Sequence, residues 1–167
     1  GIKNLEYRGY DSAGFAVLSR SGIKSDKAIG RVAKLEEKIG DVEKIPGTAG
    51  IIHSRWATHG QVTEENAHPH SDCQGNIWLV HNGIIENYQE LKADLAKSGH
   101  KFNSETDTET LVHLIEEFRN QNPEFTLEEA VRLALLSVRG TYGLAVIDKR
   151  DPEKLIAARN FSPLLLG

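Results

Sequence analysis

The chain has 167 residues and a formal net charge of -4, with 26% charged and 39% apolar residues. This length suffices for one hydrophobic core, so we expect a single domain over residues 1–167. The acidic balance argues against nucleic-acid binding, which usually needs a basic surplus. No apolar run approaches the roughly 20 residues of a membrane helix, so we expect neither nucleic acid nor membrane as a partner.

Strands are predicted where short apolar segments are bounded by turn residues. The first two, at 12–18 and 23–29, should form a hairpin across the turn Ser19-Arg20-Ser21-Gly22. Further strands are predicted at 49–53, 76–81, 144–147 and 155–158. The apolar run at 164–166 looks like an interrupted strand.

Helical periodicity begins near Val32, Tyr88, Thr106 and Thr126. The last two helices open on Thr-x-x-Glu, which predicts a capping box at each, and Gly140 should stop the last one. Hairpin strands together with paired helices favour an α+β fold, with an antiparallel sheet and helices on its outer faces. A parallel α/β sheet is the alternative.

The polar stretch 55–75 shows little periodicity, and loops of that length in compact domains are usually functional or disordered. Within or beside it lie five histidines: His53, His59, His68, His70 and His81. With Asp72 and Cys73 nearby, they could form a zinc or iron site. The alternative is that they hydrogen-bond loop backbone, which His68-Pro69-His70 favours because proline fixes the local chain.

Two strand ends carry polar groups that could bind a substrate. Arg55 could bind a carboxylate bidentately beside Trp56, or it could be a surface arginine next to a packed tryptophan. Asn82 and Gly83 could supply the paired N–H donors of an oxyanion hole. The alternative for Asn82-Gly83 is a tight turn, although no partner strand is predicted directly after it.

Asp107 and Cys73 each allow a functional and a plain interpretation. Asp107 lies in the polar cluster 104–109, where it could pair with a substrate ammonium or simply cap a helix. Cys73 could be a nucleophile, but no base is implied by its spacing, so we interpret it as a bystander. As the only cysteine it excludes an internal disulfide and fits a reducing cytoplasm.

Five segments together are far more specific than any one of them: Tyr7-Arg8-Gly9-Tyr10-Asp11-Ser12, residues 53–60, Asn66-Ala67-His68-Pro69-His70, residues 81–87 and residues 104–109. In this order they resemble the glutaminase domain of the glutamine–fructose-6-phosphate aminotransferases, a family of class II glutamine amidotransferases. The resemblance covers essentially the whole chain. Trp-Ala-Thr-His-Gly at 56–60 and Thr-Asp-Thr-Glu at 106–109 favour this family over its class II relatives.

The resemblance implies a four-layer αββα sandwich of antiparallel sheets, of the N-terminal-nucleophile hydrolase type. It implies that Arg55 binds the glutamine α-carboxylate, Asp107 its α-ammonium, and that Asn82 and Gly83 form the oxyanion hole. It further implies a pocket shaped by Trp56, Thr58 and His59, and a nucleophile whose amino terminus lies near Arg8 and Gly9. It implies no metal and no cofactor, and it makes Cys73 an ordinary loop residue.

The sequence departs from the family at its start. The family's nucleophile is a cysteine at the mature N-terminus, whose α-amine serves as base, whereas position 1 here is glycine. The family's first strand and most of its first helix are also missing, and Leu5-Glu6-Tyr7 looks like the tail of that helix. With no methionine in the chain, we interpret Gly1 as an internal cut.

We therefore expect the chain as written to hydrolyse no glutamine. It is then either a truncated enzyme domain, a non-catalytic glutamine-binding or regulatory module, or part of another class II amidotransferase. As an enzyme domain, it would pass ammonia to fructose 6-phosphate in an absent isomerase domain. The full enzyme is expected to be a cytoplasmic homo-oligomer.

Overall fold

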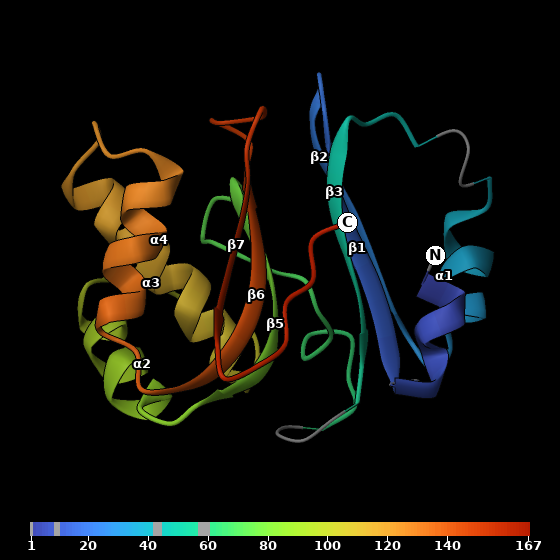
Figure 1. The fold of residues 1–167 in the computed structure, drawn as a ribbon, viewed down its shortest axis with the longest axis horizontal. Coiled ribbons are helices and arrows are strands. Elements are labelled where there is room, and N and C mark those ends of the chain that lie inside the picture. The colour runs from blue at the N-terminus through green and yellow to red at the C-terminus, as the bar shows by residue number, and fades with distance from the viewer. Residues whose placement is uncertain (1, 9–10, 42–44, 57–60) are drawn as a thin grey trace.

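Two antiparallel sheets stack face to face, with helices on their outer sides (Figure 1). The computed structural model describes residues 2–8, 11–41, 45–56 and 61–167, and for Leu5, Glu6 and Arg8 it describes the backbone only. One helix, α1, covers the first sheet, and α2, α3 and α4 cover the second. The predicted α+β class with antiparallel strands is confirmed.

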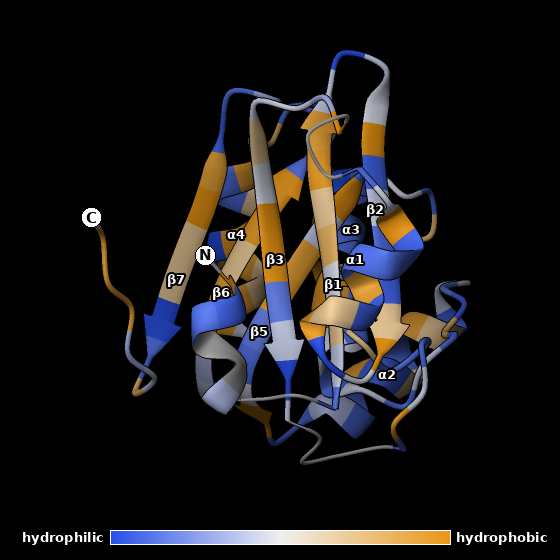
Figure 2. Cartoon of the chain, turned by 90° about the vertical axis from the view of Figure 1, so that its right-hand side faces the viewer, coloured by the Kyte–Doolittle hydropathy of each residue, from blue (hydrophilic) through white to orange (hydrophobic). Residues whose placement is uncertain are grey.

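The first sheet has the strand order β2-β1-β3, so β3 lies at its edge among the described residues. Its strands are β1 (Ser12–Ser19), β2 (Gly22–Ile29) and β3 (Ala49–Arg55). As predicted, β1 and β2 form a hairpin. Helix α1 (Val32–Ile39) packs across β1 and β2, while the 3-10 helix η1 (Ile2–Arg8) packs beside β3 (Figure 2).

The second sheet has the order β4-β5-β6-β7. Its strands are β4 (His70–Ser71), β5 (Ile77–Ile85), β6 (Gly140–Asp148) and β7 (Leu155–Asn160). Its outer face is covered by α2 (Tyr88–Lys97), α3 (Asp107–Gln121) and α4 (Leu127–Leu136). None of the described helices combines the length and the apolar character that crossing a membrane requires.

Alternation along the strands divides the apolar side chains among three clusters. On β1, Phe15 joins the cluster under α1, whereas Ala16 and Leu18 join Ile147 of β6 between the two sheets. The largest cluster fills the space between the second sheet and its three helices, and it includes Leu79 of β5. Side chains two residues apart share a face of a strand, so each sheet can bury both of its faces.

Several predicted strands are longer in the structure, and three predictions are wrong in ways that matter for the site or the fold. The strand predicted at 76–81 continues to Ile85, and Asn82 and Gly83 pair with Gly143 and Tyr142 instead of forming a tight turn. Helix α4 ends at Leu136, and Gly140 begins β6 rather than stopping the helix. Residues 164–166 form no strand.

Only one of the two predicted capping boxes is complete. At α4, Thr126 and Glu129 make both reciprocal hydrogen bonds. At α3, the Thr106 hydroxyl accepts from the Glu109 N–H. The Glu109 carboxylate instead accepts from the N–H groups of Asn103 and Ser104, which lie in the turn before α3.

Candidate functional site

A cavity of about 770 Å³ lies where the C-terminal ends of β3 and β5 meet the start of α3. Its volume is typical of small-molecule sites. Five of the predicted site residues line it: Arg55, Trp56, Asn82, Gly83 and Asp107. Gly9, Thr58 and His59 lie outside the described residues, and Arg8 is described only as backbone at the end of η1.

Arg55 is the last residue of β3 and is only 5% exposed. Its Nη1 atom donates to the Gln61 carbonyl oxygen at 3.4 Å. Burial lowers the pKa of the guanidinium, and attraction from Asp11 and Asp107 acts in the opposite direction. Because arginine stays charged under all ordinary conditions, the cavity contains a fixed cation. Trp56 follows at the rim and is 58% exposed.

Asp107 is the first residue of α3, and its carboxylate is directed toward β5. Its Oδ2 atom accepts from the Ile85 N–H at 2.8 Å and lies 3.9 Å from His81 Nδ1. The N-cap side chain of α3 is that of Thr106, and Asp107 lies in the first turn of the helix, where its carboxylate also faces the cavity. With Arg55, Asp107 gives one cavity a cation and an anion, the two charges that a zwitterionic amino acid needs.

Asn82 is held by a histidine of the other sheet. His53 Nε2 lies 2.9 Å from Asn82 Oδ1, and a carboxamide oxygen only accepts, so the imidazole donates. Burial lowers the pKa of His53 to about 4, which keeps the ring neutral near pH 7. Because the Asn82 side-chain oxygen accepts from His53, the NH₂ group of the same amide is left to act as a donor.

Gly83 pairs with Tyr142 of β6, and its neighbours on β5 indicate the direction of its own N–H group. His81 N–H donates to His68 Nδ1 at 3.3 Å, and Ile85 N–H donates to Asp107. N–H groups two residues apart along a strand point to the same edge. On a regularly extended strand the Gly83 N–H would be directed to the same edge, between these two, and Asn82 and Gly83 both line the cavity. Its φ of 138° lies in a region that glycine alone occupies readily.

Three further buried histidines form a neutral hydrogen-bonded array with two threonines. His81 Nε2 donates to the Thr141 carbonyl oxygen at 3.3 Å, so its Nδ1 accepts from the Thr108 hydroxyl at 3.1 Å. That hydroxyl lies 3.4 Å from His68 Nε2, and His70 Nε2 lies 3.0 Å from Thr106 Oγ1. Burial lowers the pKa of all three imidazoles.

The sequence allowed two interpretations of these histidines, a metal site or hydrogen bonds to loop backbone, and their observed partners favour hydrogen bonding. His53, His68, His70 and His81 bond to amide, hydroxyl and backbone groups, and they belong to no group of potential metal ligands found among the described residues. His59 lies outside those residues. The expectation of backbone partners is partly correct. His68 and His81 each bond to one backbone group, but the other partners are side chains.

Two residues that line the cavity, His53 and Thr108, were not predicted from the sequence to belong to a substrate site. A signal for His53 exists, because it lies two residues before Arg55 and so shares its face of β3. No local pattern could indicate that Thr108 would bridge two histidines from distant segments.

Known proteins similar to this chain agree on a family. Residues 53–167 match a family model described as a glutamine amidotransferase domain. The chain is 52% identical over 167 residues to the glutamine–fructose-6-phosphate aminotransferase (isomerizing) of Pyrococcus horikoshii. It is 50% identical to the enzyme of that name from Thermus thermophilus. The whole chain is covered in both comparisons, but it spans only 27% of each relative.

Two solved structures share the fold. One is the glutamine phosphoribosylpyrophosphate amidotransferase of B. subtilis complexed with ADP and GMP, with a TM-score of 0.76 and 28% identity over 95% of this chain and 33% of that one. The other is described as the allosteric regulatory enzyme of purine biosynthesis, with a TM-score of 0.74 and 28% identity over 89% of this chain and 31% of that one.

Proposed function

Since this chain belongs to the class II glutamine amidotransferases, we propose that its cavity binds glutamine and stabilises the oxyanion formed as the side-chain ammonia is released. The observation that carries the proposal is the lining of one cavity by a buried arginine, an aspartate and two amide donors. Arg55 binds the α-carboxylate, and Asp107 accepts from the α-ammonium. The substrate side chain then extends toward Asn82 and Gly83, which donate to the carbonyl oxygen as negative charge develops on it. The family resemblance assigns Trp56, Thr58 and His59 to the same pocket, and Trp56 lines the cavity.

The attacking group in this proposal is a cysteine thiolate at the amino terminus of a segment preceding Gly1, close to Arg8 and Gly9. The free α-amine of that cysteine takes the thiol proton, the thiolate attacks the amide carbon, and the proton passes to the departing nitrogen as the C–N bond breaks and ammonia leaves. Water then hydrolyses the resulting thioester to glutamate. The edge position of β3 supports a further strand there, since an edge strand offers unpaired N–H and C=O groups. Ile52 of β3 is also 49% exposed. With that strand, the fold is a four-layer αββα sandwich of the N-terminal-nucleophile hydrolase type.

Cys73 does not take the place of that cysteine in the proposal. It lines a second cavity and is not among the residues of the first. Burial raises the pKa of its thiol, which disfavours the thiolate that attack requires.

We further propose that the ammonia aminates fructose 6-phosphate in an isomerase domain beyond these residues, within a cytoplasmic homo-oligomer. The name of the relatives supports this acceptor, and their greater length leaves room for such a domain.

The charge assignments can be tested in the full-length protein by glutamine-dependent release of glutamate. Arg55→Gln and Asp107→Asn should each raise KM for glutamine by about 30-fold or more, because removing one partner of a buried charge pair costs about 2 kcal/mol or more. Arg139→Gln and Asp94→Asn are matched controls, since both side chains are exposed and neither lines the cavity. An unchanged KM in both cavity variants would refute the assignment.

The proposed location of the nucleophile predicts that the 167-residue polypeptide alone releases no glutamate from glutamine. Incubation of the purified polypeptide with glutamine and a coupled glutamate assay measures this. Turnover that Cys73→Ala abolishes would contradict both the inactivity and the assignment of Cys73.

A further inference from the structure

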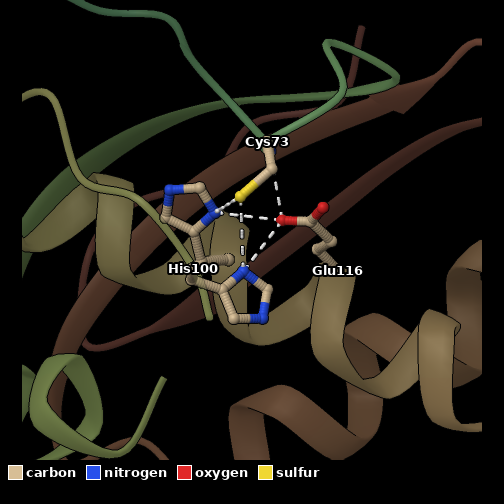
Figure 3. A group of neighbouring side chains, drawn as sticks. Cys73, His100 and Glu116 are labelled. Atoms are coloured by element: carbon tan, nitrogen blue, oxygen red, sulfur yellow. Dashed lines mark hydrogen bonds and ion pairs between the residues drawn. The ribbon is translucent and has the colours of Figure 1, made fainter. Parts of the chain in front are cut away.

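Four potential metal ligands from three segments converge beside the second sheet (Figure 3). Cys73 lies in the connection between β4 and β5, and His100 follows α2. His113 and Glu116 lie on α3, three residues apart and therefore on one face of the helix. His100, His113 and Glu116 are buried, whereas Cys73 is exposed.

Four of the six distances between the ligand atoms are close to those around a small tetrahedral cation. Cys73 Sγ lies 3.6 Å from Nδ1 of both His100 and His113. Glu116 Oε2 lies 3.1 Å from His100 Nδ1 and 3.0 Å from His113 Nδ1. A tetrahedral Zn²⁺ with ordinary bond lengths separates sulfur from nitrogen by about 3.6 Å and nitrogen from oxygen by about 3.3 Å. All four ligand atoms lie within 4.8 Å of one another.

We propose that Cys73, His100, His113 and Glu116 bind one Zn²⁺ ion at a structural site. The ligand set, one thiolate, two imidazoles and one carboxylate, is of the kind that zinc prefers. The charges of the thiolate and the carboxylate balance that of the ion. All four tetrahedral positions are filled by protein, as in structural rather than catalytic zinc sites.

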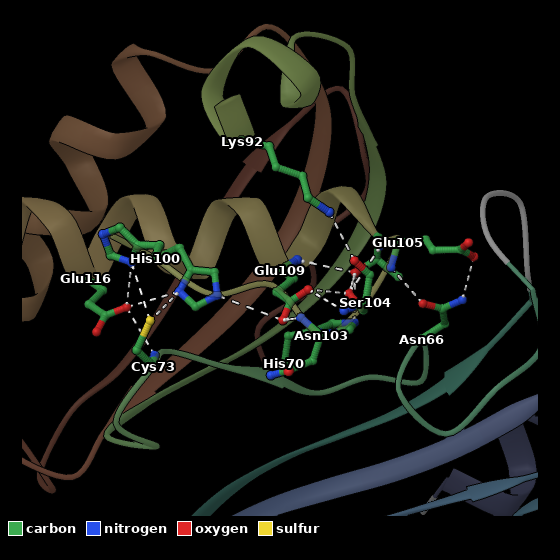
Figure 4. Close-up of polar contacts among 12 residues, drawn as sticks. Asn66, His70, Cys73, Lys92, His100, Asn103, Ser104, Glu105, Glu109 and Glu116 are labelled. Atoms are coloured by element: carbon green, nitrogen blue, oxygen red, sulfur yellow. Dashed lines mark hydrogen bonds and ion pairs between the residues drawn. The ribbon is translucent and has the colours of Figure 1, made fainter. Parts of the chain in front are cut away.

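The outer imidazole nitrogens face carboxylates, as metal-bound histidines usually do. His100 Nε2 lies 2.9 Å from Glu117 Oε2. His113 Nε2 has no hydrogen-bond partner and lies 3.9 Å from Glu109 Oε1. Glu109 is itself held by the N–H groups of Asn103 and Ser104 (Figure 4). This arrangement fixes both rings with Nδ1 turned toward the common point.

The site has both an entry path and a structural purpose. A cavity of about 540 Å³ is lined by Cys73 and His113, so an ion can reach the ligands from solvent. Once bound, the ion would cross-link the β4–β5 connection, the segment after α2 and helix α3. The expectation of no metal followed from the family resemblance, and the zinc or iron site considered from the sequence combined Cys73 and Asp72 with the histidines between positions 53 and 81, not with His100 and His113. The one local signal is His113-x-x-Glu116.

The experiment uses untagged full-length protein that has been stripped of metal with a chelator and titrated with Co²⁺ as a spectroscopic probe. One equivalent should bind, with the visible bands of tetrahedral cobalt and a thiolate-to-cobalt charge-transfer band, and Zn²⁺ should displace it. Cys73→Ser should lose the charge-transfer band. Glu117→Gln should weaken binding by about 10- to 100-fold, whereas Glu128→Gln, an exposed glutamate of α4, should leave it unchanged.

Thermal unfolding provides a second readout. Restoring Zn²⁺ should raise the Tm of the stripped wild-type protein but not that of Cys73→Ser. A wild-type protein that shows no charge-transfer band and no change in Tm overturns the proposal. A charge-transfer band that persists in Cys73→Ser places the metal elsewhere and overturns it as well.

Discussion

Gly83 combines two constraints that no side chain satisfies. A Cβ atom at this position would lie 2.1 Å from the Thr141 carbonyl oxygen, far inside van der Waals contact. Its φ of 138° adds backbone strain for any other residue. Gly40 also has a positive φ, of 74°, but a Cβ there would meet nothing within 4 Å. Substitution at Gly40 therefore measures backbone strain alone, whereas substitution at Gly83 measures strain together with a steric clash.

Gly83→Ala should lower the free energy of unfolding by about 3 kcal/mol or more, because β5 must shift away from β6. Gly40→Ala should lower it by only about 1 to 2 kcal/mol, because it adds strain without a collision. Urea unfolding of full-length protein carrying each substitution measures the difference. Equal losses would show that β5 accommodates the methyl group, and the close approach to Thr141 would then be unimportant.

At the scale of elements, α3 and α4 begin with the same Thr-x-x-Glu pattern but use the glutamate differently. Glu129 closes an exposed capping box on Thr126. Glu109 is buried and accepts from Asn103 N–H, Ser104 N–H and the Ser104 hydroxyl. The N–H groups of the turn before α3 would be buried without partners if the Glu109 carboxylate did not accept from them. Glu109 therefore stabilises the turn, whereas Glu129 caps its helix.

Glu109→Gln should therefore destabilise the protein by about 2 to 3 kcal/mol, because an amide replaces a buried charged acceptor of several hydrogen bonds. Glu129→Gln should cost about 0.5 kcal/mol or less, since glutamine also closes a capping box. Chemical unfolding of both variants gives the comparison. A cost at Glu129 as large as that at Glu109 would contradict the division of roles.

Short hairpins and amphipathic helices were predictable, because turn residues and periodicity are local signals. The extension of β5 through Asn82-Gly83 was not, since this dipeptide favours turns and only pairing with β6 keeps it extended. Arg55 and Asp107 were suggested by chemistry and by resemblance. The hydrogen bond from His53 to Asn82 depends on the packing of two sheets, and the group around Cys73 on the meeting of three segments.

At the scale of the whole molecule, four buried neutral histidines make stability depend on pH. The folded-state pKa of each is lowered, in every case chiefly by burial. Below pH 6.5, the ordinary pKa of histidine, these imidazoles bind protons in the unfolded chain but not in the folded chain. The folded state therefore loses stability as pH falls. For His53 the loss develops between pH 6.5 and about 4.

His53→Gln isolates one such contribution, because the other titrating groups are common to both proteins. The wild type should be the more stable at pH 7, where His53 is neutral and donates to Asn82. By pH 4.5, about 2 units below the ordinary pKa of 6.5, the advantage should shrink by about 2 to 3 kcal/mol, at about 1.4 kcal/mol per unit. Urea unfolding at the two pH values tests this, and a constant difference would mean that His53 titrates normally.

The cavity draws its polar groups from β3, β5 and α3, so their relative positions are fixed by the packing of the two sheets. On the proposed function, Arg55, Asp107 and the Asn82–Gly83 pair hold three different substituents of one tetrahedral carbon. Three fixed attachment points distinguish a chiral molecule from its mirror image. The arrangement would therefore reject D-glutamine even though it offers the same carboxylate, ammonium and amide, and this handedness would arise from sheet stacking rather than from any single side chain.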